Sequence, residues 1–574
     1  MLREPWGEVE NDLRLIRRRA EEELGAQHLD IPFEIPPEGL GDICFPTFQY
    51  SSILNTSPEG CAMSMASSMD KGSYFSKHEA ARGYVNSFVD WGKLTPQVIE
   101  SIISLGSEYG NLEPKKERIL LEHTSVNPTG PIHIGRSRNS IIGDTLARVL
   151  RRAGYEVTAE FLVNDTGKQM VILTWGKKNI LEKELPEARR DKDDHLLVRY
   201  YQKAYEILES DPSLEEKIEE LVLRLDSGEE EILSEAKSVA ERVIKGMVST
   251  LEDVNVSLDS YFWESDTILD GSVQEVIRSL KDSEYARSDE GAYYLDLAPF
   301  GIHGWDARFF FTRKDGSSLY TTRDIAYHLS KFKRCDTAIN VLGEDQKLGM
   351  KRLSLALEMM GVEKKPETLF YAFVSLPTGK MSTRSGAAVL LDDLIEESRS
   401  RASEEVKKRR PDLSPEKVKS IANIVGTGAV RYNILRVQAE KKMVFKWEEA
   451  LNFEGNSAPF IQYSHARACS ILRKCPESPE ANYALLTHPA EVLLISSLSK
   501  FPSVIRSCAD SRRVHSLAAY VFDLSSNFNQ FYRDCGVIHA EPRLRGARSA
   551  LVECTKIVLA NCLETMGIEA PEEM

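Results

Sequence analysis

The chain lacks the features that mark membrane and secreted proteins. It has no long apolar run, and its N-terminus (MLREPWGEVENDL) is acidic, so the sequence predicts neither a signal peptide nor a membrane-spanning helix. Its nine cysteines are scattered, with Cys469 and Cys475 the closest pair, which disfavours a zinc site and a disulfide framework. We therefore expect a cytoplasmic protein with reduced thiols and no membrane partner.

The chain also lacks an excess of positive charge. Lysine and arginine total 73 against 88 aspartates and glutamates, which gives a net charge of −15. This balance disfavours general affinity for nucleic acid, so any RNA binding must use local basic surfaces. The 574 residues, of which 42% are hydrophobic and 28% charged, are enough for three or four globular domains.

Two common nucleotide-binding motifs are missing, because the chain contains neither G-x-G-x-x-G nor G-x-x-x-x-G-K-[ST]. A different pattern of strand, turn, helix and strand surrounds His133. Residues 117–125 (ERILLEHTS) and 155–163 (YEVTAEFLV) are typical of strands, and residues 126–131 (VNPTGP) predict a turn after the first of them. We expect the helix to begin near His133, with apolar residues on one face and a glycine at its end: Ile141, Ile142, Leu146, Val149, Leu150 and Gly154.

The start of this helix has the chemistry that phosphate binding needs. A helix N-terminus presents unpaired amide donors and the positive end of the helix dipole. The imidazole of His133 adds a donor, and Gly135 allows a nucleotide to approach the backbone closely. Alone, the H-I-G-R sequence also fits a histidine that caps a surface helix.

A second motif, residues 380–384 (KMSTR), follows another predicted strand at residues 369–376 (LFYAFVSL). Gly379 and Gly386 bound the motif, which is typical of a mobile loop. The charge of Lys380 can then reach a triphosphate as negative charge builds on the departing pyrophosphate. An ordinary solvated Gly-Lys turn is the alternative for this loop alone. Two such motifs in this order, each directly after a strand, favour a shared ATP site.

The two motifs resemble the HIGH and KMSKS elements of class I aminoacyl-tRNA synthetases, and longer runs resemble the arginyl-tRNA synthetases. The resemblance extends from about residue 120 to the C-terminus and is looser before that point. The runs that carry it are HTSVNPTGPIHIGRSRNSIIGDTLARVLRRAGYEV (123–157), SLYTTRDIAYHL (318–329), VLGEDQ (341–346), KMSTRSGAAVLLDDL (380–394) and FKWEEALNFEGNSAPFIQYSHARACSILRK (445–474).

The resemblance implies an α/β fold class with a split Rossmann-type catalytic domain, in which both halves of the domain contribute strands to one parallel sheet. We expect this domain at residues 112–400, with a helical insertion around 177–300, where the stretch 177–245 is rich in charged residues and leucine. The resemblance also implies an N-terminal α+β domain (1–111) that contacts the outer corner of tRNA. A helical anticodon-binding domain (401–574) would complete the chain.

Local patterns refine the two ends of the chain. Residues 11–24 predict an amphipathic charged helix, and residues 64–73 (SMASSMDKGS) predict a loop. The N-terminal domain could equally be a structural appendage. From Pro411 onward the pattern is helical, with basic residues near aromatic ones, which suits phosphates and unstacked bases. Packed aromatic residues beneath solvated charges would give the same composition.

The resemblance assigns roles to individual residues. The positions that match the catalytic motifs are His133, Gly135, Arg136, Lys380, Met381, Ser382 and Arg384, and ATP binding is implied for His133, Gly135, Gly343 and Lys380. The positions that match arginine-binding residues are Glu122, Asn127, Tyr320, Asp324 and Gln346. Carboxylates suit a guanidinium because they accept paired hydrogen bonds that an ammonium cannot copy. For Asp324, a salt bridge with Arg323 or a helix cap is the alternative role.

Two positions depart from the family motifs. The first motif ends in Arg136 where the family has histidine, although a guanidinium can still donate to a phosphate or ribose. The second motif has Thr383 in place of its second lysine, which leaves Lys380 and Arg384 as its charged residues. Some family members carry a compensating lysine just before the first motif, but residues 129–131 here are Thr-Gly-Pro.

The activity that the resemblance implies is arginine–tRNA ligase. ATP would activate L-arginine as arginyl-adenylate with release of pyrophosphate, and the acyl group would pass to the 3′-terminal adenosine of tRNA(Arg). Neither step needs a protein nucleophile. The expected partners of this monomer are tRNA(Arg), L-arginine and ATP with Mg²⁺, without zinc, and phosphates and water would hold the Mg²⁺. The family further implies that activation of arginine requires bound tRNA.

Two other functions stay open at this point. A related class I synthetase for glutamate, glutamine or cysteine would share both motifs, but Glu122 and Asp324 would repel glutamate, and zinc ligands for cysteine are missing. A tRNA-binding relative without catalysis would have no need to keep His133, Gly135 and Lys380 together with the arginine pocket.

Overall fold

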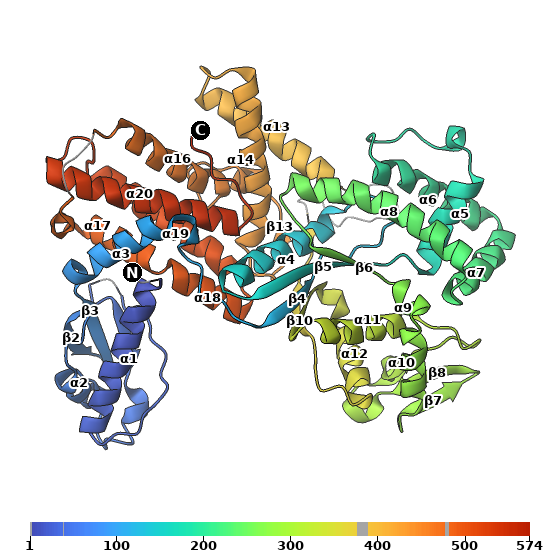
Figure 1. Ribbon diagram of the computed structural model, residues 1–574, viewed down its shortest axis with the longest axis horizontal. Helices are drawn as coiled ribbons and strands as arrows, with labels where there is room; N and C mark the ends of the chain where they lie inside the picture. Colours follow the sequence, from blue (N-terminus) through green and yellow to red (C-terminus); the bar gives the residue numbers. More distant parts are fainter. Residues whose placement is uncertain (1–2, 38, 376–388, 477–480) are drawn as a thin grey trace.

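A five-stranded parallel sheet lies at the centre of the molecule (Figure 1). The computed structural model describes residues 3–37, 39–375, 389–476 and 481–574. The strands run in the order β11-β10-β4-β5-β6 across the sheet. Their bounds are β4 (Arg118–Glu122), β5 (Glu156–Val163), β6 (Ser260–Trp263), β10 (Thr337–Gly343) and β11 (Glu367–Tyr371). Because β10 and β11 of the second half pair with β4 of the first, the predicted split parallel sheet is confirmed.

Helix α4 (Ile134–Arg152) connects β4 to β5 on one side of the sheet, and α11 (Tyr320–Arg334) and α12 (Lys347–Met359) lie on the other (Figure 1). Gly154 follows α4 with a φ of 89°, a left-handed conformation that suits a glycine cap. The predicted unit of strand, turn, helix and strand is therefore confirmed, although β4 ends at Glu122 rather than at residue 125. The apolar face of α4 is buried as expected: Ile141, Ile142, Leu146, Val149 and Leu150.

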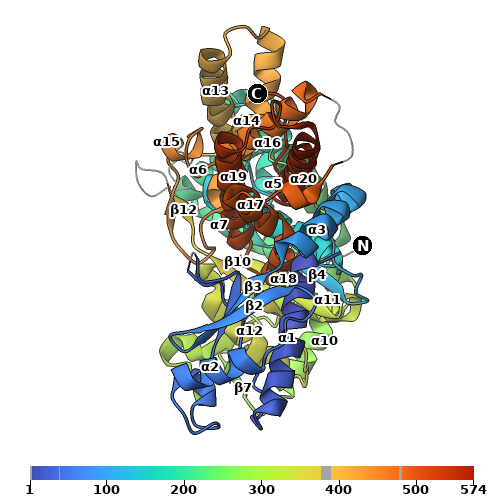
Figure 2. The same ribbon diagram turned by 90° about the vertical axis from the view of Figure 1, so that its left-hand side faces the viewer.

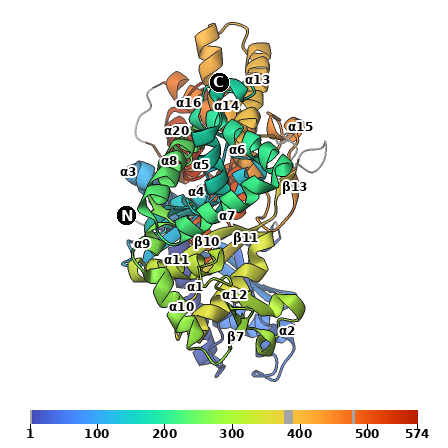
Figure 3. The same ribbon diagram turned by 90° about the vertical axis from the view of Figure 1, so that its right-hand side faces the viewer.

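Charged helices connect β5 to β6, and Figure 3 views the molecule from their side. They are α5 (Gly167–Asn179), α6 (Asp193–Ser210), α7 (Pro212–Asp226) and α8 (Glu230–Asp253), which confirms the helices predicted for residues 177–245. The wider range of 177–300 is wrong as an insertion, because it includes β6 of the central sheet. A strand of four residues carries too little periodicity to be recognised in the sequence. We call α5 to α8 the helical insertion.

A small antiparallel sheet follows β6 and leads into α11. Its strands run in the order β7-β8-β9, and it packs with α10, α11 and α12 around a second apolar core that includes Leu295, Phe309 and Leu353. The bounds are α9 (Asp266–Leu269), α10 (Ser272–Lys281), β7 (Ala286–Asp289), β8 (Ala292–Asp296) and β9 (Arg308–Phe310).

The N-terminal region is an α+β unit with a three-stranded antiparallel sheet in the order β1-β3-β2. Its elements are α1 (Pro5–Glu23), β1 (Ile43–Pro46), α2 (Pro58–Ser68), β2 (Phe75–Ala81), β3 (Tyr84–Val89) and α3 (Trp91–Leu105). The loop predicted for residues 64–73 is wrong for residues 64–68, because α2 continues to Ser68, and is confirmed for residues 69–73. Ser57 caps α2 by accepting from the amide of Gly60, and Met65 is fully buried.

The C-terminal region is helical, and α3 packs against its helices α17 and α20 (Figure 2). Its elements are α13 (Leu391–Arg409), α14 (Pro415–Leu435), α15 (Trp447–Ala450), α16 (Ala458–Lys474), α17 (Pro489–Ser499), α18 (Phe501–Ser511), α19 (His515–Asp534) and α20 (Pro542–Thr565), with a short parallel pair between β12 (Val374–Ser375) and β13 (Met443–Val444). The domain boundary predicted at residue 400 falls inside α13. Within the described residues no single helix is long and apolar enough to cross a membrane, and α17 and α18 pass that test of length and composition only as a pair bent by 42°.

Candidate active site

The first motif lies where two parallel strands end side by side. β4 and β10 are neighbours, and Glu122 at the end of β4 lies opposite Asn340. From β4 the chain builds the sheet in one direction through β5 and β6, and later in the other through β10 and β11. Open α/β sheets bind ligands at such a switch point, outside the carboxyl ends of the strands. The topology therefore places a site at the N-terminus of α4.

The imidazole of His133 caps α4 and leaves one nitrogen free. Nδ1 accepts a hydrogen bond from the amide of Gly135 at 3.0 Å, so Nε2 carries the ring proton. Burial, together with the positive charge of Arg136, lowers the pKa of His133 and keeps the ring neutral. Nε2 is buried and has no hydrogen-bond partner in the described part of the chain. A buried donor of this kind needs an acceptor, and a phosphate oxygen is a suitable one.

Gly135 makes room for this imidazole. A Cβ atom at position 135 would lie 3.0 Å from Nδ1 and 3.3 Å from Cε1 of His133. A side chain there would therefore push the ring away from its cap. The sequence predicts that Gly135 allows a nucleotide to approach the backbone. In the structure, the atoms nearest to the missing side chain belong to His133.

The segments that flank the second motif meet the first one. The amide of Ile134 donates to the carbonyl of Val389 at 3.1 Å, and the amide of Leu391 donates to the carbonyl of Ile132 at 2.8 Å. On the other flank, the exposed guanidinium of Arg136 lies 5.6 Å from the ring centre of Phe373. Both ends of the intervening segment are thus at the start of α4. The predicted residues of that segment lie outside the described residues: Lys380, Met381, Ser382 and Arg384.

Tyr320 and Asp324 begin α11 and share one face of it, as their spacing predicts. The carboxylate of Asp324 raises the pKa of the Tyr320 phenol, so this hydroxyl stays protonated and can donate. Arg323 is turned away and pairs with buried Asp226 and Glu264, each at 3.3 Å. The alternative role of Asp324, a salt bridge with Arg323, is therefore wrong, because Arg323 pairs with other carboxylates.

A chain of polar contacts connects Asp324 to Glu122. Nδ1 of His328 lies 3.2 Å from Oδ1 of Asp324, and Nε2 of His328 lies 2.9 Å from the side-chain nitrogen Nδ2 of Asn340. The oxygen of Asn340 accepts from Lys331, whose ammonium also donates to Glu122. Lys331 is fully buried, so its ammonium needs both acceptors, and the carboxylate of Glu122 and the side-chain oxygen of Asn340 are held in place by it. The charge of Glu122 is thereby neutralised, whereas Asp324 has no lysine or arginine partner among the described residues and lies beside His328 and Tyr320.

The three remaining predicted residues line the same edge of the sheet. Asn127 is exposed in the connection from β4 to α4 and donates to Gln169 at 2.8 Å. Gln346 directly precedes α12, just after β10. Gly343 ends β10, and a Cβ atom there would clash with Oδ1 of Asp345 and lie 3.0 Å from the ring of Phe373. Gly343 thus allows β10 to pack against the flank of the second motif.

Comparisons with known proteins agree with this geometry. The family model described as the catalytic domain of class I (R) tRNA synthetases matches residues 98–447, and the DALR anticodon-binding domain matches residues 461–574. The chain belongs to the arginyl-tRNA synthetase family.

Relatives that match nearly the whole chain support the assignment of this synthetase to the family. An arginine–tRNA ligase of Methanocella arvoryzae is 43% identical over 96% of this chain and 94% of its own length. The arginine–tRNA ligase of Methanothermobacter thermautotrophicus is 39% identical over 98% of this chain and 100% of its own length. The solved arginyl-tRNA synthetase of Thermus thermophilus is 27% identical with a TM-score of 0.83, covering 98% of this chain and 99% of that one. Arginyl-tRNA synthetase from Plasmodium falciparum, at 19% identity and a TM-score of 0.79, shares the fold.

Sequence reasoning missed the residues that fix the turn before α4 of the synthetase. Thr124 has a φ of 73°, a left-handed conformation that costs a non-glycine residue about 1–3 kcal/mol. Asn139, buried in α4, holds this turn by accepting from the amide of Thr124 and donating to the carbonyl of Val341, each at 2.9 Å. The signal in the sequence was a polar residue on the otherwise apolar inner face of α4.

Two buried arginines join the catalytic and helical regions of the synthetase. Arg138 of α4 donates to four carbonyls, at Ala372 and at residues 437, 438 and 441. Arg431 of α14 pairs with Asp144 of α4 at 2.6 Å and donates to the carbonyl of Met566 at 2.6 Å. α4 therefore carries the first motif at one end and the contacts to the helical region along its length.

Proposed function

We propose that this arginine–tRNA ligase binds the phosphates of ATP at the N-terminus of α4. The observation that carries the proposal is the buried Nε2 donor of His133, which has no partner among the described residues. The amides of Ile134 and Gly135 already donate within the chain, so the helix itself contributes the positive end of its dipole. Arg136 is exposed beside His133, and the flanks of the second motif are anchored on both sides. From there Lys380 would supply charge to the pyrophosphate as it leaves.

Arginine occupies the acidic pocket beside this site. Its guanidinium would donate to the carboxylate of Asp324 and to the phenol oxygen of Tyr320. Glu122, Asn127 and Gln346 would hold the α-amino and α-carboxylate groups of the amino acid. The support is the placement of Asp324, which has no arginine or lysine partner in the described residues, and the buried charges around Tyr320. A bidentate pair with a carboxylate selects the planar guanidinium over the ammonium of lysine.

The chemistry follows from positioning. The carboxylate of arginine attacks the α-phosphate in line, a P–O bond forms, and pyrophosphate departs with the electrons of the broken bond. The acyl group then passes to a hydroxyl of the terminal adenosine, and AMP leaves. Mg²⁺ accompanies ATP and offsets phosphate charge when bound. His133 and Arg136 are donors rather than metal ligands, which fits an ion that is held by phosphates and water.

Transfer RNA binds along the helical region and the N-terminal unit. The guanidinium of Arg467 lies 4.8 Å from the ring centres of both Tyr463 and Tyr532, and these tyrosines are 42% and 46% exposed. An exposed set of two rings and one cation suits the stacking of unpaired anticodon bases. The N-terminal unit would contact the outer corner of tRNA. We propose residues 1–111, 112–400 and 401–574 as the tRNA-contacting, catalytic and anticodon-binding domains, with α13 extending across the second boundary.

We also propose that arginine activation requires bound tRNA and that the enzyme works as a monomer in the cytoplasm without zinc. All nine cysteines are free, and eight of them are buried, which suits a reducing compartment. Light scattering behind size exclusion tests the monomer, and a dimer peak at working concentration would reject it.

The deciding experiment is ATP–pyrophosphate exchange with each of the twenty amino acids, with and without total tRNA. Exchange with arginine alone, and only with tRNA, is the expected result. Exchange with another amino acid would reject the pocket, and robust exchange without tRNA would reject tRNA-dependent activation. Tight tRNA binding with no ATP-dependent product would indicate a non-catalytic paralogue.

A further inference from the structure

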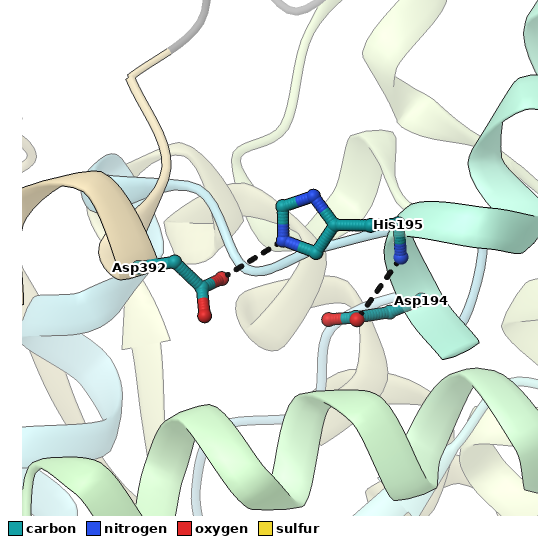
Figure 4. A group of neighbouring side chains, drawn as sticks. All are labelled: Asp194, His195 and Asp392. Carbon is teal, nitrogen blue, oxygen red and sulfur yellow. Dashed lines mark hydrogen bonds and ion pairs between the residues drawn. The ribbon is translucent and has the colours of Figure 1, made fainter. Parts of the chain in front are cut away.

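A buried polar cluster ties the helical insertion to the first turn of α13 (Figure 4). Asp194 and His195 begin α6, and Asp392 begins α13, with ligand atoms of all three within 4.8 Å of one another. Nε2 of His195 lies 3.2 Å from one oxygen of Asp392. The other oxygen accepts from Lys192 at 2.7 Å and from Thr250 of α8 at 3.1 Å. Three donors from the helical insertion therefore converge on one carboxylate.

The cation of this cluster is the ammonium of Lys192. It contacts Asp392 and lies 3.6 Å from Oδ2 of Asp194, an oxygen without a hydrogen-bond partner in the part of the chain that the structure describes. Burial alone would raise the pKa of Asp392, but His195 and Lys192 outweigh it and hold that pKa well below its usual range. Lys192 is the counter-charge of Asp392, and burial raises the pKa of Asp194 toward its neutral form, so the arrangement is a latch rather than a metal site.

The other side of the same turn contacts the candidate ATP site. Leu390 forms an antiparallel bridge with His133, and the amide of Leu391 donates to Ile132 at 2.8 Å. Only one residue therefore separates the backbone that pairs with the first motif from the carboxylate that the helical insertion holds. Asp392 itself is 8% exposed, and its side-chain hydrogen bonds within the described residues go to Lys192, His195 and Thr250 rather than to α4.

We propose that Asp392 is a positioning residue for ATP: by fixing the first turn of α13 to the helical insertion, it sets how residues 389–391 meet His133. This inference rests on the proposed function, because it assigns ATP to the N-terminus of α4. Any shift of α6 or α8, for example when tRNA contacts the helical insertion, is transmitted through Lys192, His195 and Thr250 to the edge of that site. The coupling element is the buried ion pair, which has one well-defined arrangement.

The test is steady-state pyrophosphate exchange by the full-length enzyme with arginine and tRNA. Asp392→Asn keeps the shape of the side chain and removes its charge. We expect KM for ATP to rise about 10-fold, with KM for arginine unchanged within twofold or so. Thr250→Val removes one donor without changing volume and should shift KM for ATP in the same direction by less. Thermal melting of each variant reports stability separately.

Glu396→Gln is the matched control. Glu396 lies on the same helix and also pairs with the helical insertion, through Arg190 at 2.8 Å, but its side chain is 67% exposed. It should leave both KM values unchanged. If Asp392→Asn fails to fold, Thr250→Val decides the question.

The proposal is overturned if the folded variants melt earlier but keep the wild-type KM for ATP, or if KM for arginine rises equally. An additive effect of Lys192→Met and Asp392→Asn on KM for ATP would also overturn it, because partners in one latch must be non-additive. Absence of arginine-dependent exchange in the wild-type enzyme would instead reject the proposed function.

Discussion

The ion pair of Asp144 and Arg431 should hold the catalytic and helical regions together, and Asp144→Asn tests it. Both side chains are at most 1% exposed, and the charged atoms are 2.6 Å apart. Arg431 also donates to the hydroxyl of Thr145 and to the carbonyls of Val254, Asn255 and Met566. The substitution keeps the size of the side chain and leaves a buried guanidinium with neutral acceptors only.

The magnitude follows from burial. Removing one member of a buried ion pair costs about 3–5 kcal/mol, since the partner charge stays in a medium of low polarity. At about 1.4 kcal/mol per factor of ten, the unfolding equilibrium should change by at least two powers of ten. Asp253→Asn is the control, because the pair of Asp253 with Arg399 also links two helices, at 2.8 Å, but is 46% and 28% exposed. Its loss should cost less than about 1 kcal/mol.

Urea unfolding at neutral pH, followed by circular dichroism, measures both variants. Because a chain of several domains need not unfold in one step, the midpoint of the first transition and the unfolding rate are compared. Asp144→Asn should unfold first and fastest, and Asp144→Asn with Arg431→Met should recover part of the loss. An Asp144→Asn enzyme as stable as the Asp253→Asn control would refute the reasoning.

The pH dependence of this pair gives an independent check. Burial raises the pKa of Asp144, but the charges of Arg431 and Arg148 outweigh it and lower the pKa below its usual value. A carboxyl with a depressed folded pKa contributes stability above its unfolded pKa of about 4, and loses it as pH falls through the folded pKa. The difference between wild type and Asp144→Asn should therefore shrink only in acid. A difference that vanishes already near neutral pH would contradict the assignment.

Three further predictions concern the site. Gly135→Ala places a Cβ 3.0 Å from Nδ1 of His133, and kcat for pyrophosphate exchange should fall about 100-fold with an unchanged melting temperature; unchanged kcat would show that the ring position is irrelevant. Asp324→Asn should raise KM for arginine about 10- to 100-fold, the value of one or two charged hydrogen bonds, without changing KM for ATP, and equal effects on both would reject the pocket. Burial lowers the pKa of His123 to about 4, so its folded pKa lies below the unfolded one. The free energy of unfolding should therefore drop by about 3 kcal/mol as pH falls from about 6.5 to about 4. In a pH series of urea titrations, His123→Gln should flatten this slope.

Local patterns predicted the part of the fold that surrounds the first motif. The apolar period of α4, its glycine cap and the two flanking strands are all encoded within residues 117–163, so no distant contact was needed to find them. The same reasoning failed at α2, where Ser64 and its polar neighbours suggested a loop. The cap from Ser57 and the burial of Met65 decided in favour of a helix.

The buried arginines could not be predicted, because their partners are distant in sequence. Arg138 bonds to carbonyls about 230 to 300 positions further on, and a carbonyl acceptor leaves no trace in side-chain identity. Arg431 reaches back to Asp144 on another domain. Arg431 is one of the basic residues near aromatic ones after Pro411, a pattern that suits phosphates, yet its side chain is fully buried. Composition alone cannot separate a solvated basic residue from an interdomain one.

The charges in the arginine pocket argue for selection by geometry. Glu122 is already neutralised by Lys331, so the pocket does not attract cations through a large excess of negative charge. Within the described residues Asp324 has no cationic partner, since its carboxylate lies beside the imidazole of His328 and the protonated phenol of Tyr320. Lysine would meet the same single charge as arginine but would fill fewer of its acceptor positions, leaving polar atoms unpaired in a half-buried site. Discrimination should therefore depend on the orientation of Asp324, which the contacts from His328 through Asn340 and Lys331 to Glu122 hold in place.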